Sequence, residues 1–290
     1  MPGIATYRRA EFDVAALVDE KVRAGRRVSV VIPARDEEST IGAIVAAIRD
    51  ALVDAVPLVD EILVADDRSV DATAREAVAG GARVVATDDG AGERGKGDAL
   101  WRGVRASTGD VLAFVDGDLV DFDPGFVVGL LGPLLTARCG DVSFVKGFYE
   151  RPLDGAPRGG GRVTELAARP IIAILLDHLD GIVQPLAGEF AARRDVLERL
   201  PFVRGYGVDI ALLADAARTF GVETIAQVDL GRRQHRNRPL EELGPMAAEV
   251  LLAALSRAGV AVPESVELTV PGAGTSIVSV AERPPLVGPV

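Results

Sequence analysis

Val111-Leu-Ala-Phe-Val-Asp-Gly-Asp118 joins a continuous apolar run to two carboxylates two residues apart. A short apolar run bounded by polar residues predicts a strand that is buried on both faces of a sheet. Ligands of open α/β sheets bind at the carboxyl ends of such strands, so Asp116 and Asp118 are predicted to lie at a binding site. Asp-Gly-Asp is also ordinary turn chemistry, and a plain turn remains the alternative.

The close spacing of these carboxylates indicates a cation. Two negative side chains in one crevice need a compensating positive charge, and oxygen ligands favour Mg²⁺, or Mn²⁺ as an alternative, over a soft metal. A metal ion that also binds a diphosphate meets both requirements. The residues therefore predict a nucleotide ligand.

Composition limits the class of protein. The chain has 290 residues, of which 48% are hydrophobic, so it is long and apolar enough for a substantial core. Its one cysteine, Cys139, excludes an intramolecular disulfide and favours a reducing, cytoplasmic setting. No signal peptide or membrane anchor is predicted, because the apolar run from Phe126 to Leu135 is short and broken by glycine and proline. A net charge of −11 argues against nucleic acid as a partner.

One segment is basic against this acidic background. Gly231-Arg-Arg-Gln-His-Arg-Asn-Arg-Pro239 holds four arginines and one of the two histidines of the chain, without an acidic partner. A local basic loop of this kind predicts a site for a small anion. A solvated run of charge is the alternative.

Strands and helices alternate through the first half of the sequence. Apolar runs predict strands at 28–33, 61–65, 83–86 and from 111 onward, and helical spacing predicts helices at 41–52, 72–79 and 98–107. The less regular second half predicts strands at 142–149 and 224–230 and helices at 163–176, interrupted at Pro170, at 207–220 and at 240–258. Repeated βα units predict an α/β fold with a mostly parallel sheet. Residues 1–26 are expected to form an N-terminal segment, and residues 259–290 a tail or dimer arm.

A glycine-rich loop precedes the third predicted helix, but Lys96 is followed by Gly97 rather than Ser or Thr, which argues against a P-loop. Three strand ends give a more specific signal: Ile32-Pro-Ala-Arg-Asp-Glu-Glu38, Asp66-Asp67 and Asp116-Gly-Asp118. In this order they resemble the nucleotide-sugar-dependent glycosyltransferases of the GT-A fold, in which helices flank a Rossmann-like, mostly parallel sheet.

Six further phrases narrow the resemblance to the family of glucosyl-3-phosphoglycerate synthases. They are Gly95-Lys-Gly-Asp-Ala-Leu-Trp101, Val145-Lys-Gly-Phe-Tyr-Glu-Arg-Pro152, Gly159-Gly-Gly-Arg-Val-Thr-Glu-Leu166, Gln184-Pro-Leu-Ala-Gly-Glu189, Gly205-Tyr-Gly-Val-Asp-Ile210 and His235-Arg-Asn-Arg-Pro-Leu240. The resemblance covers residues 27–258, which we take as the GT-A domain. It implies a retaining transfer of glucose from UDP-glucose to the 2-hydroxyl of 3-phosphoglycerate. It further implies a homodimeric actinobacterial enzyme that starts methylglucose lipopolysaccharide synthesis.

The resemblance also implies roles for individual residues. The nucleotide donor would be held by Pro33, Ala34, Glu37, Asp67, Lys96 and Asp116. Asp118 and His235 would bind the divalent metal, and Asp116, Asp118, Asp209 and the backbone carbonyl of Leu186 would serve the transfer itself. The acceptor 3-phosphoglycerate would be bound by Gly161, Arg162, Thr164, Arg233 and Asn237.

Two departures from the family pattern affect the choice of donor. Asp209 stands where the family usually has Glu, and Asp67-Arg-Ser69 stands where it has Ser-Gly-Ser. GDP-glucose is therefore an alternative donor. The competing functions are mannosyl transfer from GDP-mannose to the same acceptor, sugar-phosphate nucleotidyl transfer, and nucleotide-sugar binding without catalysis.

Overall fold

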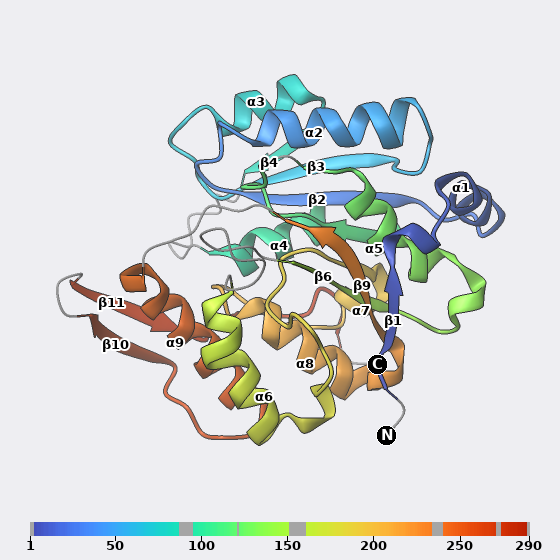
Figure 1. The fold of residues 1–290 in the computed structure, drawn as a ribbon. Helices are drawn as coiled ribbons and strands as arrows, with labels where there is room; N and C mark the ends of the chain where they lie inside the picture. Colours follow the sequence, from blue (N-terminus) through green and yellow to red (C-terminus); the bar gives the residue numbers. More distant parts are fainter. Residues whose placement is uncertain are drawn as a thin grey trace.

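An eight-stranded sheet forms the centre of the molecule, in the order β1-β9-β6-β7-β5-β2-β3-β4 (Figure 1). Our computed structural model describes residues 3–86, 95–120, 122–150, 161–233, 240–270 and 274–288. The strands of the sheet are β1 (Ala5–Arg8), β2 (Val28–Ala34), β3 (Glu61–Asp66), β4 (Arg83–Ala86), β5 (Val111–Phe114), β6 (Phe144–Glu150), β7 (Phe190–Arg193) and β9 (Ile225–Arg232).

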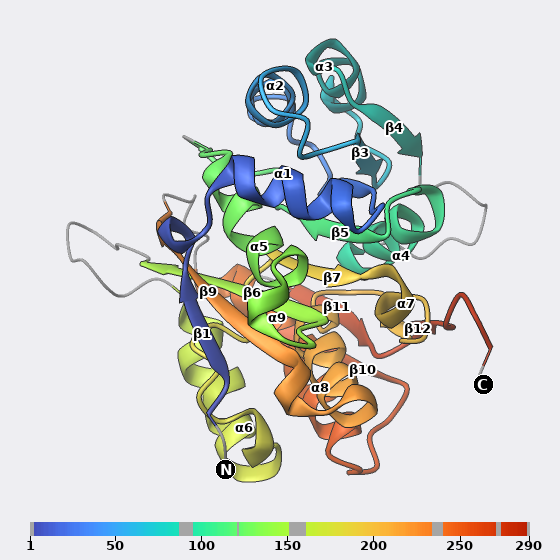
Figure 2. The ribbon, with the colours of Figure 1, turned by 90° about the vertical axis from the view of Figure 1, so that its right-hand side faces the viewer.

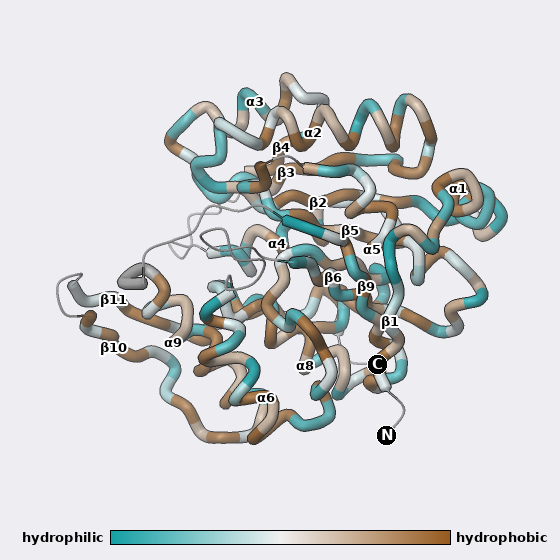
Figure 3. Tube along the Cα trace, in the orientation of Figure 1, coloured by the Kyte–Doolittle hydropathy of each residue, from teal (hydrophilic) through white to brown (hydrophobic). Residues whose placement is uncertain are grey.

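The mostly parallel character predicted for the sheet is confirmed. Strands β2, β3, β4 and β5 are parallel to one another, and so are β1, β6 and β9. Strand β7 is the exception, because it lies antiparallel between β5 and β6. All four residues of β5 are buried, as the continuous apolar run predicts, and the central strands appear largely in the hydrophobic colour in Figure 3.

Helices cover both faces of this sheet. They are α1 (Val14–Arg23), α2 (Ile41–Arg49), α3 (Thr73–Gly80), α4 (Lys96–Ala106), α5 (Gly125–Leu135), α6 (Arg169–Leu175), α7 (Arg194–Leu197), α8 (Val208–Phe220) and α9 (Leu240–Arg257). Because side chains alternate along a strand, β2 serves two cores. Val31 packs in the core shared with α4 and α8, whereas Val30 and Ile32 pack in the core shared with α1, α2 and α5. Figure 2 shows α1 and α5 together.

Two elements near the N-terminus were not predicted. Strand β1 joins the sheet beside β9, with Ala5 opposite Ala226, and Leu17 of α1 is buried in the core. Residues 1–26 were expected to form a segment outside the main domain. The structure instead places part of them in the sheet and the core, while the domain boundaries themselves stay a prediction.

Helix α5 was also missed, because it is apolar on every side and contains two internal glycines and Pro133. Gly132 makes room for an aromatic ring, since a Cβ there would lie 2.2 Å from the ring of Phe12. Such a helix lacks the amphipathic period from which helices are predicted. No helix in the described part of the chain is long and apolar enough to cross a membrane.

The C-terminal region forms short strands. Strands β10 (Ser265–Val270) and β11 (Gly274–Ser279) pair antiparallel, and β12 (Glu282–Arg283) pairs with β8 (Phe202–Val203). The interruption predicted at Pro170 corresponds to a π-helical turn, Thr164–Ala168, immediately before α6. Proline donates no backbone hydrogen bond, so the wider turn accommodates it.

Candidate functional site

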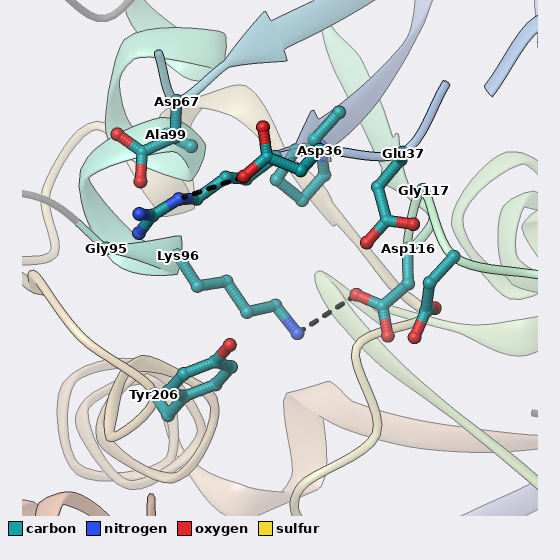
Figure 4. Close-up of a pocket in the computed structure, with 13 residues that line it drawn as sticks. Asp36, Glu37, Asp67, Gly95, Lys96, Ala99, Asp116, Gly117 and Tyr206 are labelled. Carbon is teal, nitrogen blue, oxygen red and sulfur yellow. Dashed lines mark ion pairs between the residues drawn. The ribbon is translucent and has the colours of Figure 1, made fainter. Parts of the chain in front are cut away.

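A cavity of about 430 Å³ opens where strands β2, β3 and β5 end (Figure 4). Its walls come from the loops after these three strands, from the first turn of α4 and from Tyr206. The lining residues are Pro33, Ala34, Arg35, Asp36, Glu37, Asp67, Gly95, Lys96, Ala99, Asp116, Gly117, Asp118 and Tyr206. All six predicted donor-binding residues and the predicted metal ligand Asp118 are among them. The structure thus brings them together, although their individual roles stay predictions.

The loops after β2 and β3 hold each other through side chains. The Asp36 carboxylate accepts a hydrogen bond from the backbone N–H of Val70 at 2.8 Å, and the N–H of Asp36 donates to the Ser69 hydroxyl at 3.0 Å. The N–H of Glu37 donates to the Thr73 hydroxyl at 2.7 Å. Asp36 has a φ of 55°, a left-handed conformation that aspartate tolerates better than most residues. This rim of the cavity is therefore held by hydrogen bonds within the protein.

The first turn of α4 is pressed against the backbone that follows β8. A Cβ on Gly97 would lie 1.7 Å from the carbonyl oxygen of Val203, so only glycine fits there. Gly95 and Lys96, at the start of α4, line the cavity. Helix N-termini attract anions such as phosphate because their backbone N–H groups lack partners within the helix.

Lys96, at the start of α4, is the cation at the centre of the cavity. Its ammonium group lies 3.0 Å from Asp116 and 3.1 Å from Asp209 (Figure 4 shows the first pair). Burial alone would lower its pKa, but the two carboxylates outweigh burial and raise the pKa of Lys96 above its ordinary value. Lys96 is therefore a permanent positive charge.

Arg233 provides a second buried cation, which shares Asp116 with Lys96. Its guanidinium lies 3.0 Å from Asp118, 3.4 Å from Asp116 and 3.0 Å from Glu189. It also donates to the Tyr149 hydroxyl, which in turn donates to Glu189 at 2.7 Å. These negative partners raise the pKa of Arg233 well above its ordinary value despite burial. The compensating cations for Asp116 and Asp118 thus include two side chains of the protein.

The comparisons with known proteins agree with this geometry. Residues 29–199 match the profile of glycosyl transferase family 2. The chain is 48% identical to the glucosyl-3-phosphoglycerate synthase of Mycolicibacterium smegmatis, over 97% of this chain and 95% of the relative. This chain belongs to the glucosyl-3-phosphoglycerate synthase family. The synthase of Petrotoga mobilis is 42% identical over 87% of this chain and 80% of its own length.

Solved structures of family members are similar over the whole fold. The Mycobacterium tuberculosis synthase in complex with phosphoglyceric acid superposes with a TM-score of 0.87 at 43% identity, covering 98% of both chains. The complex of the same enzyme with Mn²⁺, UDP-glucose and phosphoglyceric acid gives a TM-score of 0.86, covering 99% of this chain and 98% of that one. The GT-A fold class predicted from the strand ends is confirmed.

The predicted acceptor residues of this family member are only partly described. Gly161, with a φ of 78°, and Arg162 precede the π-helical turn, and Thr164 within it is buried. None of these three lines the cavity among the described residues. Arg233 faces carboxylates in the structure, so its contact with 3-phosphoglycerate stays a prediction. Asn237 lies outside the described residues.

The predicted metal pair is likewise incomplete. His235 lies outside the described residues, and the described part of the chain contains no group of three or more His, Cys, Asp or Glu side chains able to hold a metal. Asp118 can still reach a ligand in the cavity although it pairs with Arg233, because its side chain is 39% exposed and lines the cavity.

Three buried residues around the site had no predicted role: Lys146, Tyr149 and Glu189. They occur in two of the phrases that carry the family resemblance, but no function was attached to them. The signal that could have found them is the position of Lys146 inside a buried strand. A charged residue is almost never fully buried unless it is paired. Leu186 lies three residues before Glu189 and is half-buried.

Proposed function

We propose that this protein transfers glucose from UDP-glucose to the 2-hydroxyl of 3-phosphoglycerate, with retention of the α configuration. The observation that carries the proposal is the cavity: residues from three strand ends and the Lys96 helix line one site in a chain that matches the synthase family over nearly its full length. The related structures contain UDP-glucose, phosphoglyceric acid and the product glucosyl-3-phosphoglycerate.

A divalent metal, Mg²⁺ or Mn²⁺, would be held by Asp118 and His235. The related synthase has been crystallised with UDP and either metal. The oxygen of a half-exposed carboxylate fits a hard cation, and the shortage of protein ligands leaves positions for diphosphate oxygens. When bound, the metal neutralises negative charge on the diphosphate that leaves the sugar.

Lys96 and the N-terminus of α4 supply the protein's own stabilisation of the leaving group. Breaking the bond to the anomeric carbon develops negative charge on the diphosphate, and fixed positive groups aimed at that charge lower the barrier. The pairs with Asp116 and Asp209 hold the Lys96 ammonium in place before the donor binds.

We further propose that the acceptor attacks from the face that the leaving group vacates, rather than through a covalent sugar-enzyme intermediate. A nucleophilic carboxylate needs a free oxygen, but Asp116, Asp209 and Glu189 are each engaged by cations. The backbone carbonyl of Leu186 would orient the acceptor hydroxyl. Arg162 and Arg233, with Gly161, Thr164 and Asn237, would hold the phosphate and carboxylate of the acceptor through charge-assisted hydrogen bonds.

One assay tests the function. Purified protein with Mg²⁺ and 3-phosphoglycerate is supplied in turn with UDP-glucose, GDP-glucose and GDP-mannose, and the anomeric configuration of the product is determined by NMR. We expect turnover with UDP-glucose and an α product. Preferred turnover with GDP-mannose would identify a mannosyl transferase, and binding of UDP-glucose without turnover would identify a non-catalytic binding protein.

We also propose that the enzyme is a cytoplasmic homodimer from an actinobacterium and that its product enters methylglucose lipopolysaccharide synthesis, as the family resemblance implies. Residues 259–290 are proposed as the dimer arm, supported by strand β11, in which Ile277 is 75% exposed. Light scattering of the full chain gives the oligomeric state. Ile277→Asp should shift it toward monomer.

A further inference from the structure

Lys146, on strand β6, is a charged side chain that does not line the cavity and yet lies directly behind it. The residue is only 1% exposed. An ammonium group is expensive to bury unless charged and polar partners surround it. Its partners therefore indicate why a lysine occupies this position.

Two of those partners connect Lys146 to the cavity lining: Asp209 pairs with Lys96, and Ala187 precedes Gly188, which lies against Asp116. The Lys146 ammonium donates to the backbone carbonyl of Ala187 at 2.7 Å and lies 3.4 Å from the Asp209 carboxylate. It also lies 5.3 Å from the centre of the Phe190 ring, within range of a cation–π contact. Burial lowers the pKa of Lys146 and neighbouring Lys96 adds to this effect, whereas Asp209 opposes it.

The hydrogen bond from Lys146 to Ala187 holds the turn at residues 184–188, which contains Leu186. The N–H of Ala187 donates to the Gln184 carbonyl at 3.1 Å, and the preceding residue is Leu186, proposed to orient the acceptor hydroxyl. The following residue, Gly188, lies against Asp116: a Cβ there would be 2.2 Å from both carboxylate oxygens. A shift of this turn would move both neighbours of Ala187.

The contact with Asp209 sets the position of Lys96. The two lysines contact different oxygens of the Asp209 carboxylate. Lys146 lies 3.4 Å from one oxygen, and Lys96 lies 3.1 Å from the other. Lys96 also needs its 3.0 Å pair with Asp116. Without Lys146 the whole negative charge of Asp209 would act on Lys96 and draw it away from Asp116.

We propose that Lys146 is a positioning residue for glucosyl transfer, which ties the turn at 184–188 to Asp209 and so keeps Lys96 and Asp116 in their reactive arrangement. It acts through these groups, because Lys146 itself is not among the residues that line the cavity. The inference rests on the proposed function.

The test compares two buried lysines. Lys146→Met keeps an unbranched side chain only one heavy atom shorter and removes its charge, and Lys21→Met does the same at a lysine that is also buried and bonded to a backbone carbonyl and a carboxylate. Lys21 contacts Pro57 and Asp60, which precede β3 and lie at the opposite edge of the sheet. Both variants are assayed for kcat and KM, for UDP affinity with Mn²⁺ by calorimetry, and for melting temperature.

We expect Lys146→Met to lower kcat by about 10- to 100-fold, the scale of a small misplacement of reacting groups, with a smaller loss of UDP affinity because only Lys96 among the donor-binding residues is displaced. Lys21→Met should lower the melting temperature and leave kcat within about twofold of the wild type. A folded Lys146→Met protein with wild-type kcat would overturn the inference. Wild-type protein without glucosyl transfer would instead refute the proposed function, so the two failures are distinguishable.

A double-mutant cycle separates positioning from a general loss of structure. If Lys146 acts in part through Asp209, then Lys146→Met should lower kcat by a smaller factor when added to Asp209→Asn than when added to the wild type, because coupled residues are not additive. If the kcat loss of the double variant equals the product of the two single losses, the inference is contradicted. Should Lys146→Met not fold, Lys146→Gln keeps a donor for Ala187 without the charge. A fall in kcat at unchanged melting temperature then supports the inference, and wild-type kcat overturns it.

Discussion

Gly188→Ala should disable the site with a single methyl group. The φ of Gly188 lies outside the left-handed region, so alanine fits the backbone there. The new Cβ, however, would lie 2.2 Å from both oxygens of Asp116, whereas an ordinary contact begins at 3.4 Å. The carboxylate or the turn must therefore move by about 1 Å, which disturbs the 3.0 and 3.4 Å pairs of Asp116 with Lys96 and Arg233.

A displacement of that size costs about 10²-fold in turnover, which corresponds to about 2.7 kcal/mol of barrier at 1.36 kcal/mol per factor of ten. Initial rates with UDP-glucose, 3-phosphoglycerate and Mg²⁺ measure it. Gly42→Ala, on α2, is the matched control, since its Cβ would meet the Glu76 carbonyl at 3.3 Å. We expect near wild-type kcat for the control. A Gly188→Ala enzyme with kcat within about threefold of the wild type would refute the role assigned to the position of Asp116.

The remaining predictions concern the metal, the acceptor and pH. Asp118→Ala should lower turnover by at least about 10²-fold, and EDTA should do the same to the wild type; full activity in chelator would exclude a metal-dependent reaction. Arg162→Ala should raise the KM for 3-phosphoglycerate by roughly 10- to 150-fold with little change in the KM for UDP-glucose, and equal losses for both substrates would place Arg162 at the diphosphate instead. Because the pKa of Lys96 is raised in the folded state, its stabilisation is complete below the unfolded pKa of about 10.4 and is lost only as pH rises through the folded value. The difference in free energy of unfolding between wild type and Lys96→Met should therefore be the same in urea titrations at about pH 7 and pH 9, and a difference that shrinks over this range would contradict the ion pairs.

Residues that follow strand ends could be assigned to the site from local sequence patterns. A continuous apolar run predicts a buried parallel strand, and parallel strands bring their carboxyl ends to one edge of the sheet. Residues immediately after β2, β3 and β5, such as Glu37, Asp67 and Asp116, could therefore be assigned to one cavity. The basic segment near Arg233 and the family phrases indicated further candidate site residues, but they did not predict which groups those residues contact.

The pairing of buried charges, in contrast, depends on contacts between residues that are distant in the sequence. Arg233 reaches Asp118 across 115 residues, and Lys146 reaches Asp209 across 63. No local period encodes such pairs, because they follow from the antiparallel insertion of β7 between β5 and β6 and from the packing of α8 against the sheet. Side-chain charge is a property of the sequence, whereas the partner that permits its burial is set by which surfaces pack together. For that reason the cavity could be predicted from local patterns, and the buried ion pairs behind it could not.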